Sequence, residues 1–151
     1  MAIKYWDTSK VTNFTSVFGN CYRLTNLDLS LWDVSKVTRT DYMFNGCLSL
    51  KNIKCPRVQT ANLTNIYYMF CNCLSLQNID VSWLKMDAGT CTIMGYLFYN
   101  CRSLIEVNFP TNWNLTGLNN TNYAYSNLFC NCYALRKITG ITNWDLRGPT
   151  N

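Results

Sequence analysis

The sequence predicts an α/β repeat solenoid of about five turns, with short parallel strands on one face and short helices on the other. Two observations carry this prediction. The stretch "MFNGCLSLKNI", which begins at residue 43, returns almost unchanged as "MFCNCLSLQNI" at residue 69. A Phe-x-x-Cys pair also occurs five times, at successive spacings of 26, 26, 28 and 31 residues, as Phe18/Cys21, Phe44/Cys47, Phe70/Cys73, Phe98/Cys101 and Phe129/Cys132. A period near 26 residues indicates units that stack and share one apolar interior.

The strand of each unit is predicted by apolar columns that follow the cysteine. Three residues after each cysteine stand Leu24, Leu50, Leu76, Leu104 and Leu135, and six residues after stand Leu27, Ile53, Ile79, Val107 and Ile138. The stretch "LTNLDLS" ends in alternation, which is typical of a short strand. Stacked strands would form a parallel sheet that rises about 4.8 Å per turn. The chain is one domain, 1–151, with units at approximately 6–31, 32–58, 59–84, 85–112 and 113–144.

The other side of each unit is expected to be a short helix. In "SKVTNFTSVF", Val11, Phe14, Val17 and Phe18 stand at offsets 0, 3, 6 and 7. This spacing places them on one face of about two helical turns. Each unit would then combine one strand with one short helix, and the recurring residues would face inward.

Composition excludes several classes of function. Apolar residues make up 48% of the chain and charged residues 14%, so the chain is expected to fold around a core. The net charge of +5 is mild and the basic residues are dispersed, so no nucleic-acid partner is expected. No apolar run approaches the ~20 residues that span a bilayer. There is no histidine, phosphate loop or nucleophile elbow, so we expect no enzyme and no cofactor.

The nine cysteines are interpreted mainly as core residues. The five in the Phe-x-x-Cys column would be small buried thiols, and Cys55 and Cys91 also occupy apolar columns. Cys71 and Cys130 directly follow a phenylalanine, and we expect them to be more exposed. The two "CNC" stretches lie two turns apart, about 10 Å by the strand spacing, which is too far for one zinc ion to bridge. No metal site is expected.

Acidic residues recur with the repeat, which argues against a single catalytic centre. Asp7, Asp33 and Asp145 each follow a tryptophan and are expected to accept turn amides or helix N-terminal amides. A different column, on the outward side of the strands, holds Asp28, Lys54 and Asp80 in succession. This alternation is interpreted either as cross-strand charge pairing or as a polar binding surface.

Tyrosines on or near the predicted helical side form the second candidate binding surface. Aromatic residues make up 15% of the chain. Exposed tyrosines supply contact area together with a polar hydroxyl group, and they are common at interfaces. The candidates are Tyr67, Tyr68, Tyr96, Tyr99, Tyr123 and Tyr125.

The amino-acid sequence of the repeat resembles the BspA-like leucine-rich repeats of bacterial surface proteins. The resemblance rests on "WDTSKVTNFTSVFGNCYRLTNLDLS" (residues 6–30) and "LDLSLWDVSKVTRTDYMFNGCLSL" (residues 27–50). It covers essentially the whole chain and weakens from about residue 85. It implies a right-handed leucine-rich-repeat superhelix, an extracellular or cell-surface location, a role in adhesion or protein binding, and no catalytic residues.

Two functions remain open at this point. The first is a non-catalytic binding or adhesion module that presents a repeat surface to a protein or glycan partner. The second is a structural or decoration component of a larger assembly, such as a virion surface. The N-terminal "MAIKYWDTSK" has no apolar secretion segment and neither end has a polar capping unit. We therefore also expect self-association or docking through the uncapped ends.

Overall fold

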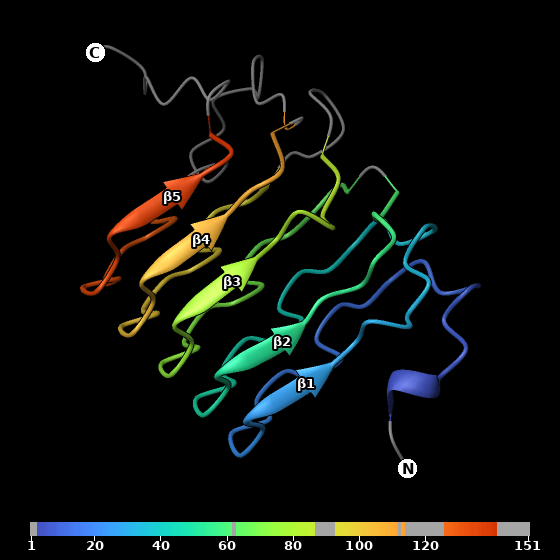
Figure 1. Cartoon of the computed structure of the whole chain (residues 1–151), viewed down its shortest axis with the longest axis horizontal. Helices are drawn as coiled ribbons and strands as arrows, with labels where there is room; N and C mark the ends of the chain where they lie inside the picture. The colour runs from blue at the N-terminus through green and yellow to red at the C-terminus, as the bar shows by residue number, and fades with distance from the viewer. Residues whose placement is uncertain (1–2, 62, 87–92, 112, 114–125, 142–151) are drawn as a thin grey trace.

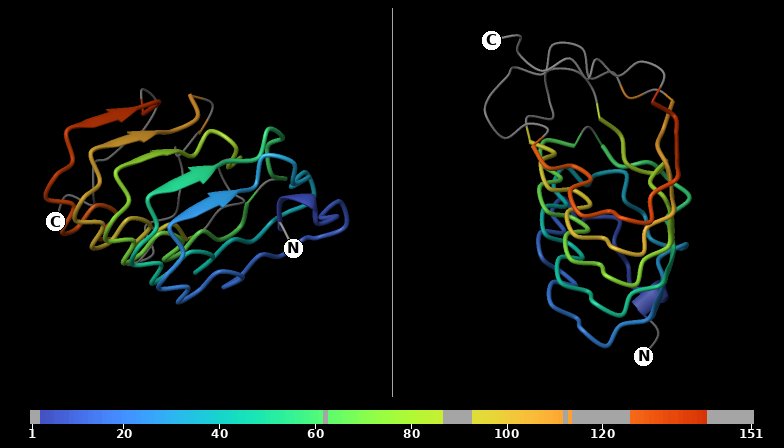
Figure 2. Two further views of the ribbon diagram at one scale, coloured as in Figure 1. Left: turned by 60° about the horizontal axis from the view of Figure 1, so that its bottom comes forward. Right: turned by 90° about the vertical axis from the view of Figure 1, so that its left-hand side faces the viewer.

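The protein winds into five stacked coils, each with one short strand. The computed structural model describes residues 3–61, 63–86, 93–111, 113 and 126–141. A 3₁₀ turn, η1 (Ile3–Tyr5), precedes the first coil, and the strands follow in the order β1 (Asn26–Asp28), β2 (Asn52–Lys54), β3 (Asn78–Asp80), β4 (Glu106–Asn108) and β5 (Lys137–Thr139) (Figure 1). Figure 2 shows the strands along one side of the stack and the return segments along the opposite side.

Parallel pairing of the strands confirms the predicted strand face. Strand β1 pairs with β2 through Asn26↔Asn52, Leu27↔Ile53 and Asp28↔Lys54. Strands β3, β4 and β5 form a second parallel sheet in the same register. The middle residues of the five strands are the predicted apolar column: Leu27, Ile53, Ile79, Val107 and Ile138.

The interior of the stack is a file of phenylalanine rings. Neighbouring ring centroids lie 5.4, 5.2, 5.3 and 5.7 Å apart and the ring planes are within 13° of parallel, along Phe18, Phe44, Phe70, Phe98 and Phe129. The three middle rings are completely buried. The prediction of one shared apolar interior is therefore confirmed. Stacked aromatic rings add to the gain from burying their apolar surface.

The predicted short helices are wrong, because the return side of each coil is built of turns. We call this part of each coil its turn segment: 14–20, 40–46, 66–72, 94–100 and 126–131. Within a turn segment, alternate N–H groups donate to the carbonyl three residues back, as from Val17 to Phe14 (3.3 Å). The N–H groups between them donate to the next coil, as from Phe18 to Met43 (2.9 Å). An α-helix would need every N–H for its own i−4 carbonyl.

Left-handed residues at two columns explain why the chain turns instead of coiling into a helix. One column holds Ser16, Tyr42, Tyr68, Tyr96 and Asn127, and the other holds Asn20, Gly46, Asn72, Asn100 and Asn131, with φ between 55° and 74°. Asn and Gly are the residues that adopt this region most readily. Side chains three residues apart share a face in successive turns as well as in a helix. The apolar spacing alone therefore could not separate the two structures.

The sheet is interrupted between β2 and β3. After β1 the Leu29 N–H donates to the Lys54 carbonyl (2.8 Å), and after β3 the Val81 N–H donates to the Asn108 carbonyl (2.9 Å). Cys55 holds the corresponding place after β2, and there its thiol donates to the Asp80 carbonyl (3.1 Å). Pro56, which lacks an N–H, follows directly. A side chain thus connects the two sheets where the backbone ladder stops.

A second ladder joins the coils at the start of the turn segments. Isolated parallel bridges link Asn13, Arg39, Asn65 and Ile93 in succession.

The part of the chain that the structure describes contains no helix of the length and apolarity needed to cross a bilayer.

Candidate functional site

The strand face carries the predicted charged column, and part of it forms ion pairs. The Asp28 carboxylate lies 3.7 Å from the Lys54 ammonium group and 3.4 Å from that of Lys4. Asp28 Oδ1 also accepts hydrogen bonds from the Ser30 hydroxyl (2.6 Å) and N–H (3.0 Å). These bonds from Ser30, followed by the charge of Lys4, lower the pKa of Asp28 from its ordinary 3.8 to about 2.

Asp80 does not continue this charge alternation. Its carboxylate accepts the Ser82 N–H (2.8 Å), and Lys54 pairs with Asp28 on the far side of the sheet interruption. A separate cross-strand pair, Lys137 with Glu106 (2.6 Å), lies between β4 and β5. Of the two interpretations left open for Asp28, Lys54 and Asp80, the charge pairing thus holds for Asp28 with Lys54. Over β1 and β2 the surface is hollowed by about 650 Å³, and Asp28 and Lys54 line this recess.

The tyrosines gather on the turn segments as one partly exposed cluster. Tyr42, Tyr68 and Tyr96 occupy a left-handed column, and their rings stack at 5.2 and 4.6 Å. Tyr67 meets all three edge-on, at 5.9, 4.3 and 5.8 Å. Tyr99 leans on Tyr96 at 5.5 Å. We call these five residues the tyrosine cluster.

Stacking in the tyrosine cluster determines which atoms a partner could reach. The rings of Tyr42, Tyr68 and Tyr96 cover one another's faces, so a partner reaches these inner faces less readily than the ring edges, and all five tyrosines are partly exposed. Desolvation raises the pKa of Tyr42 and of Tyr68 above the ordinary phenol value. Tyr42 and Tyr68 are therefore neutral at physiological pH, and a neutral phenol hydroxyl group can both donate and accept.

The structure does not bring all of the predicted site residues together. Asp28, Lys54 and Asp80 lie on the strand side, whereas Tyr67, Tyr68, Tyr96 and Tyr99 lie on the turn segments on the other side (Figure 2). Tyr123 and Tyr125 lie outside the described residues. The sequence prediction thus combined two separate surfaces.

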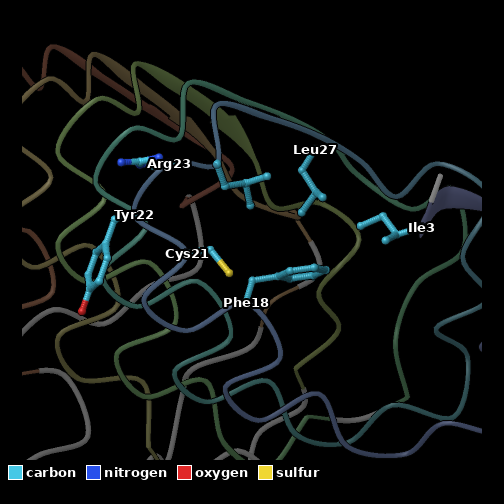
Figure 3. Close-up of a pocket in the computed structure, with 7 residues that line it drawn as sticks. Ile3, Phe18, Cys21, Tyr22, Arg23 and Leu27 are labelled. Atoms are coloured by element: carbon cyan, nitrogen blue, oxygen red, sulfur yellow. The ribbon is translucent and has the colours of Figure 1, made fainter. Parts of the chain in front are cut away.

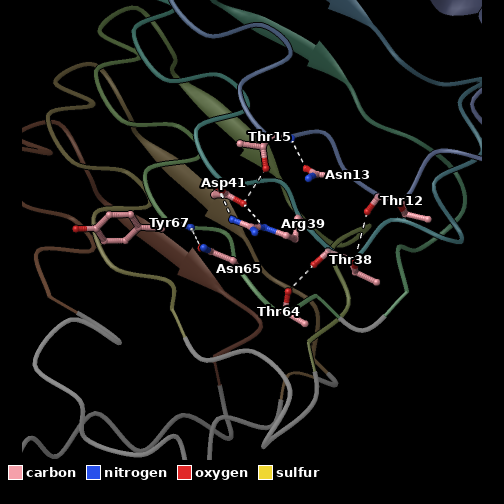
Figure 4. Close-up of polar contacts among 9 residues, drawn as sticks. All are labelled: Thr12, Asn13, Thr15, Thr38, Arg39, Asp41, Thr64, Asn65 and Tyr67. Atoms are coloured by element: carbon pink, nitrogen blue, oxygen red, sulfur yellow. Dashed lines mark hydrogen bonds and ion pairs between the residues drawn. The ribbon is translucent and has the colours of Figure 1, made fainter.

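Residues near the cluster that the sequence analysis missed come from the second coil. Tyr42 belongs to the tyrosine cluster and shares its column with Tyr68, so its place in the repeat could have identified it. Next to it, the Arg39 guanidinium holds the buried Asp41 carboxylate through two 3.0 Å bonds, and Thr15 donates to the same carboxylate (3.0 Å) (Figure 4). Arg39 stands where Asn13 and Asn65 stand in neighbouring coils, and this departure was the available signal.

The remaining acidic residues serve local turns, as predicted for Asp7 and Asp33. Asp7 Oδ1 accepts the Ser9 hydroxyl (2.7 Å) and N–H (3.0 Å), and Asp33 Oδ1 accepts the Ser35 N–H (2.9 Å). These bonds lower the pKa of both carboxyl groups. Asp145 lies outside the described residues. Asp-x-Ser is thus a turn motif of this repeat.

The cysteines of the repeat column are free thiols, and those of the middle coils are buried. Cys47, Cys73 and Cys101 are completely buried. The expectation that Cys71 is more exposed is wrong: it is 2% exposed, and burial raises its pKa to about 12. Cys130 is half-buried, and Cys91 lies outside the described residues. Across the described residues, no three His, Cys, Asp or Glu side chains are arranged to hold a metal ion.

Comparison with known proteins identifies the family of the chain. The family described as "Mycoplasma protein of unknown function, DUF285" matches residues 1–113 and again residues 57–144. The two matches overlap, as expected when one family pattern fits a repeat in two positions. Searches of curated proteins and of solved structures found no match. The matched residues include almost the whole chain, and the protein belongs to the DUF285 family, which is grouped with the BspA-like repeats.

Proposed function

We propose that the protein is a non-catalytic binding module that presents the tyrosine cluster to a partner protein. The observation that carries this proposal is the cluster itself: five partly exposed tyrosines from three successive coils, held by ring contacts of 4.3–5.9 Å. Tyrosine supplies contact area at low entropic cost when its ring is already fixed. The leucine-rich-repeat character and a surface or secreted location belong to this proposal and rest on the BspA-like resemblance.

The geometry favours a protein partner over a glycan. Sugars bind aromatic side chains through free ring faces, whereas three rings of the cluster cover one another. Hydroxyl groups and ring edges suit the polar and apolar atoms of a protein surface. A glycan partner is the second outcome that an experiment has to separate.

Binding to a panel of surface and matrix proteins and to a glycan array tests the proposal. We compare the wild type with Tyr67→Ser and Tyr99→Ser, which remove parts of the cluster. Tyr133→Ser is the matched control, since Tyr133 is highly exposed and lies outside the cluster. We expect the wild type to bind a protein ligand. We expect the affinity for this ligand to fall at least about tenfold in the two cluster variants and to stay unchanged in the control. Equal affinity in all four proteins, or binding to glycans alone, would contradict it.

A structural role in a larger assembly is the second candidate function. It is favoured by the apolar, half-exposed end faces of the stack, and it does not depend on the tyrosine cluster. A virion surface is one setting in which such a component would act.

A further inference from the structure

The backbone hydrogen bonds between turn segments run in one direction along the stack. In the first turn segment the N–H groups of Ser16, Phe18 and Asn20 donate to the second coil, at 3.1, 2.9 and 2.7 Å. The same three positions donate onward from the second, third and fourth coils. Four successive interfaces thus repeat one pattern, with donors on the C-terminal side of a coil and acceptors on its N-terminal side.

The first coil leaves the acceptor half of this pattern open. The carbonyls of Thr15, Val17 and Gly19 correspond to those of Asp41, Met43 and Asn45 in the second coil, which accept the three bonds above. Within the described residues, no N–H group donates to these three carbonyls of the first coil. They form a row of acceptors along the N-terminal end of the stack.

The fifth coil leaves the donor half open. The N–H groups of Asn127, Phe129 and Asn131 correspond to those of Ser16, Phe18 and Asn20. As far as the structure describes the chain, these N–H groups find no acceptor. The two ends of the stack therefore carry complementary halves of the same hydrogen-bond pattern.

Side chains at the N-terminal end also lack the cover that inner coils provide. Val17 is 43% exposed, whereas Met43, Met69 and Leu97 in the same column are at most 1% exposed. An apolar recess of about 550 Å³ opens beside it, lined by Ile3, Phe18, Cys21, Tyr22, Arg23, Leu24 and Leu27 (Figure 3).

Side chains of the fifth coil are uncovered in the same way. Leu128, Phe129, Cys132 and Leu135 pack against the core but are only half-buried. Their counterparts in the second, third and fourth coils are almost completely buried. Apolar surface thus accompanies the unused backbone groups at both ends.

From these two faces we propose that a second copy of this chain docks head to tail, with its fifth coil on the first coil of its neighbour. Three backbone hydrogen bonds and the apolar side chains around them would repeat the internal interface. If two N-terminal ends met, the carbonyl groups of Thr15, Val17 and Gly19 in one copy would face the same carbonyl groups in the other. A two-fold dimer through this face would therefore form none of the three backbone hydrogen bonds. A head-to-tail contact leaves a free face at each end and can extend into an open stack.

Docking requires one local displacement, at η1. In the repeat, Ile3 holds the place that Leu29 holds after β1 and Gly140 holds after β5, so the neighbour's chain at Gly140 meets η1. No residue of η1 is buried, although Ile3 packs against the core. Among the described residues, its polar contacts are the bonds from the Trp32 indole (2.9 Å) and the Trp6 N–H (3.0 Å) to the Ile3 carbonyl and the Lys4–Asp28 ion pair. This turn yields its place when the copies dock.

Sedimentation and light scattering over a range of concentrations test the proposal with two single variants. Val17→Asp places a charge on the N-terminal face at a site that is already exposed, and Leu128→Asp does so on the C-terminal face. The wild type is expected to associate as concentration rises, and each variant alone is expected to remain monomeric. Mixing the two variants is expected to restore a 1:1 dimer, because each keeps the face that the other has lost.

Leu48→Asp is the matched control, since Leu48 is 37% exposed but lies in the second coil, away from both end faces. It is expected to associate like the wild type. A wild type that stays monomeric at all concentrations, or a Leu128→Asp protein that still dimerises alone, would overturn the proposal. Circular dichroism verifies that each variant is folded. If Leu128→Asp does not fold, the association of Val17→Asp is compared with that of Leu48→Asp, and this comparison tests the proposal. Variants of the tyrosine cluster are expected to associate like the wild type. The docking proposal and the partner-binding proposal can therefore fail independently of each other.

Discussion

The cysteine column shows how one residue type serves a stack of coils. The thiols of Cys47, Cys73, Cys101 and Cys132 each donate to the carbonyl of the phenylalanine in the preceding coil, at 3.1, 3.3, 3.0 and 3.0 Å. A thiol is small enough for the crowded interior and still satisfies a buried acceptor. These bonds give the column a structural role that the sequence did not reveal.

Thiol labelling tests the cysteine column. Burial raises the pKa of Cys47 from 9.0 to about 11, which lowers its thiolate fraction about 100-fold at pH 8. Cys21, in the same column, is exposed. We expect iodoacetamide to modify Cys21 in the native protein and to reach Cys47, Cys73 and Cys101 only after denaturation, as mapped by mass spectrometry. Equal labelling rates at Cys21 and Cys47 would contradict the buried column.

Asp28 makes stability depend on pH in the acid range. Because its pKa is lower in the folded chain than the ordinary 3.8, the ionised carboxylate favours folding. This contribution is complete above the ordinary pKa and is lost as pH falls from about 4 toward about 2. In Asp28→Asn, the side-chain oxygen can still accept the Ser30 N–H, but the variant has no charge to lose.

Thermal unfolding at a series of pH values measures this effect. We expect Asp28→Asn to melt below the wild type at pH 7 and to lose less of its melting temperature between pH 4 and pH 2. Asn26→Ser, an exposed change on the same strand, should keep the wild-type pH dependence. Parallel curves for Asp28→Asn and the wild type would show that this carboxylate is not linked to folding.

At the scale of the element, the sequence predicted the strands but not the turn segments. The strand prediction succeeded because Leu27 and its counterparts alternate with polar residues on an exposed sheet face. The helix prediction failed because left-handed residues, such as Asn20 and Gly46, send alternate N–H groups to the neighbouring coil. That choice depends on the neighbouring coil being present, which local apolar spacing cannot encode.

The candidate site was predictable only in part for the same reason. Tyr67, Tyr68, Tyr96 and Tyr99 were recognised by position, but their stacking follows from the left-handed column that places Tyr42, Tyr68 and Tyr96 above one another. The interruption between β2 and β3 separates Lys54 from Asp80. The sequence indicates this interruption locally, because Cys55 and Pro56 replace the residues that follow the strand in other repeats.

Two glycines with positive φ, one after a strand and one in a turn segment, differ in how much space a side chain would have. A Cβ at Gly140 (φ 81°) would lie 1.9 Å from the Phe109 carbonyl oxygen, whereas at Gly46 (φ 74°) it would meet the Asn20 amide oxygen at 2.5 Å. A side-chain amide can rotate away, but backbone cannot. We expect Gly46→Ala to cost about 1 kcal/mol and Gly140→Ala at least about 2 kcal/mol in free energy of unfolding.

Urea unfolding of the two glycine variants measures this difference. The comparison is internal, since both changes add one methyl group at a left-handed residue. Equal losses would mean that the chain at Gly140 can move away from Phe109 without cost.

At the scale of the whole molecule, the proposed partner binding and the proposed docking use different surfaces of one stack. The sides carry the tyrosine cluster and the charged strand face, and the ends carry the unused halves of the coil-to-coil bonding pattern. A stack of this kind gains a similar interface with each added coil, because each coil contacts its neighbours alone. Side binding and end-to-end docking are therefore compatible in one protein.

A crystal structure of the protein would show directly whether the five coils share one interior. We expect the rings of Phe18, Phe44, Phe70, Phe98 and Phe129 to stand in one file, with neighbouring ring centroids 5.2–5.7 Å apart. We also expect the turn segments to contain no α-helix. Phenylalanines distributed over separate layers or facing solvent, or helices in place of the turn segments, would contradict these expectations.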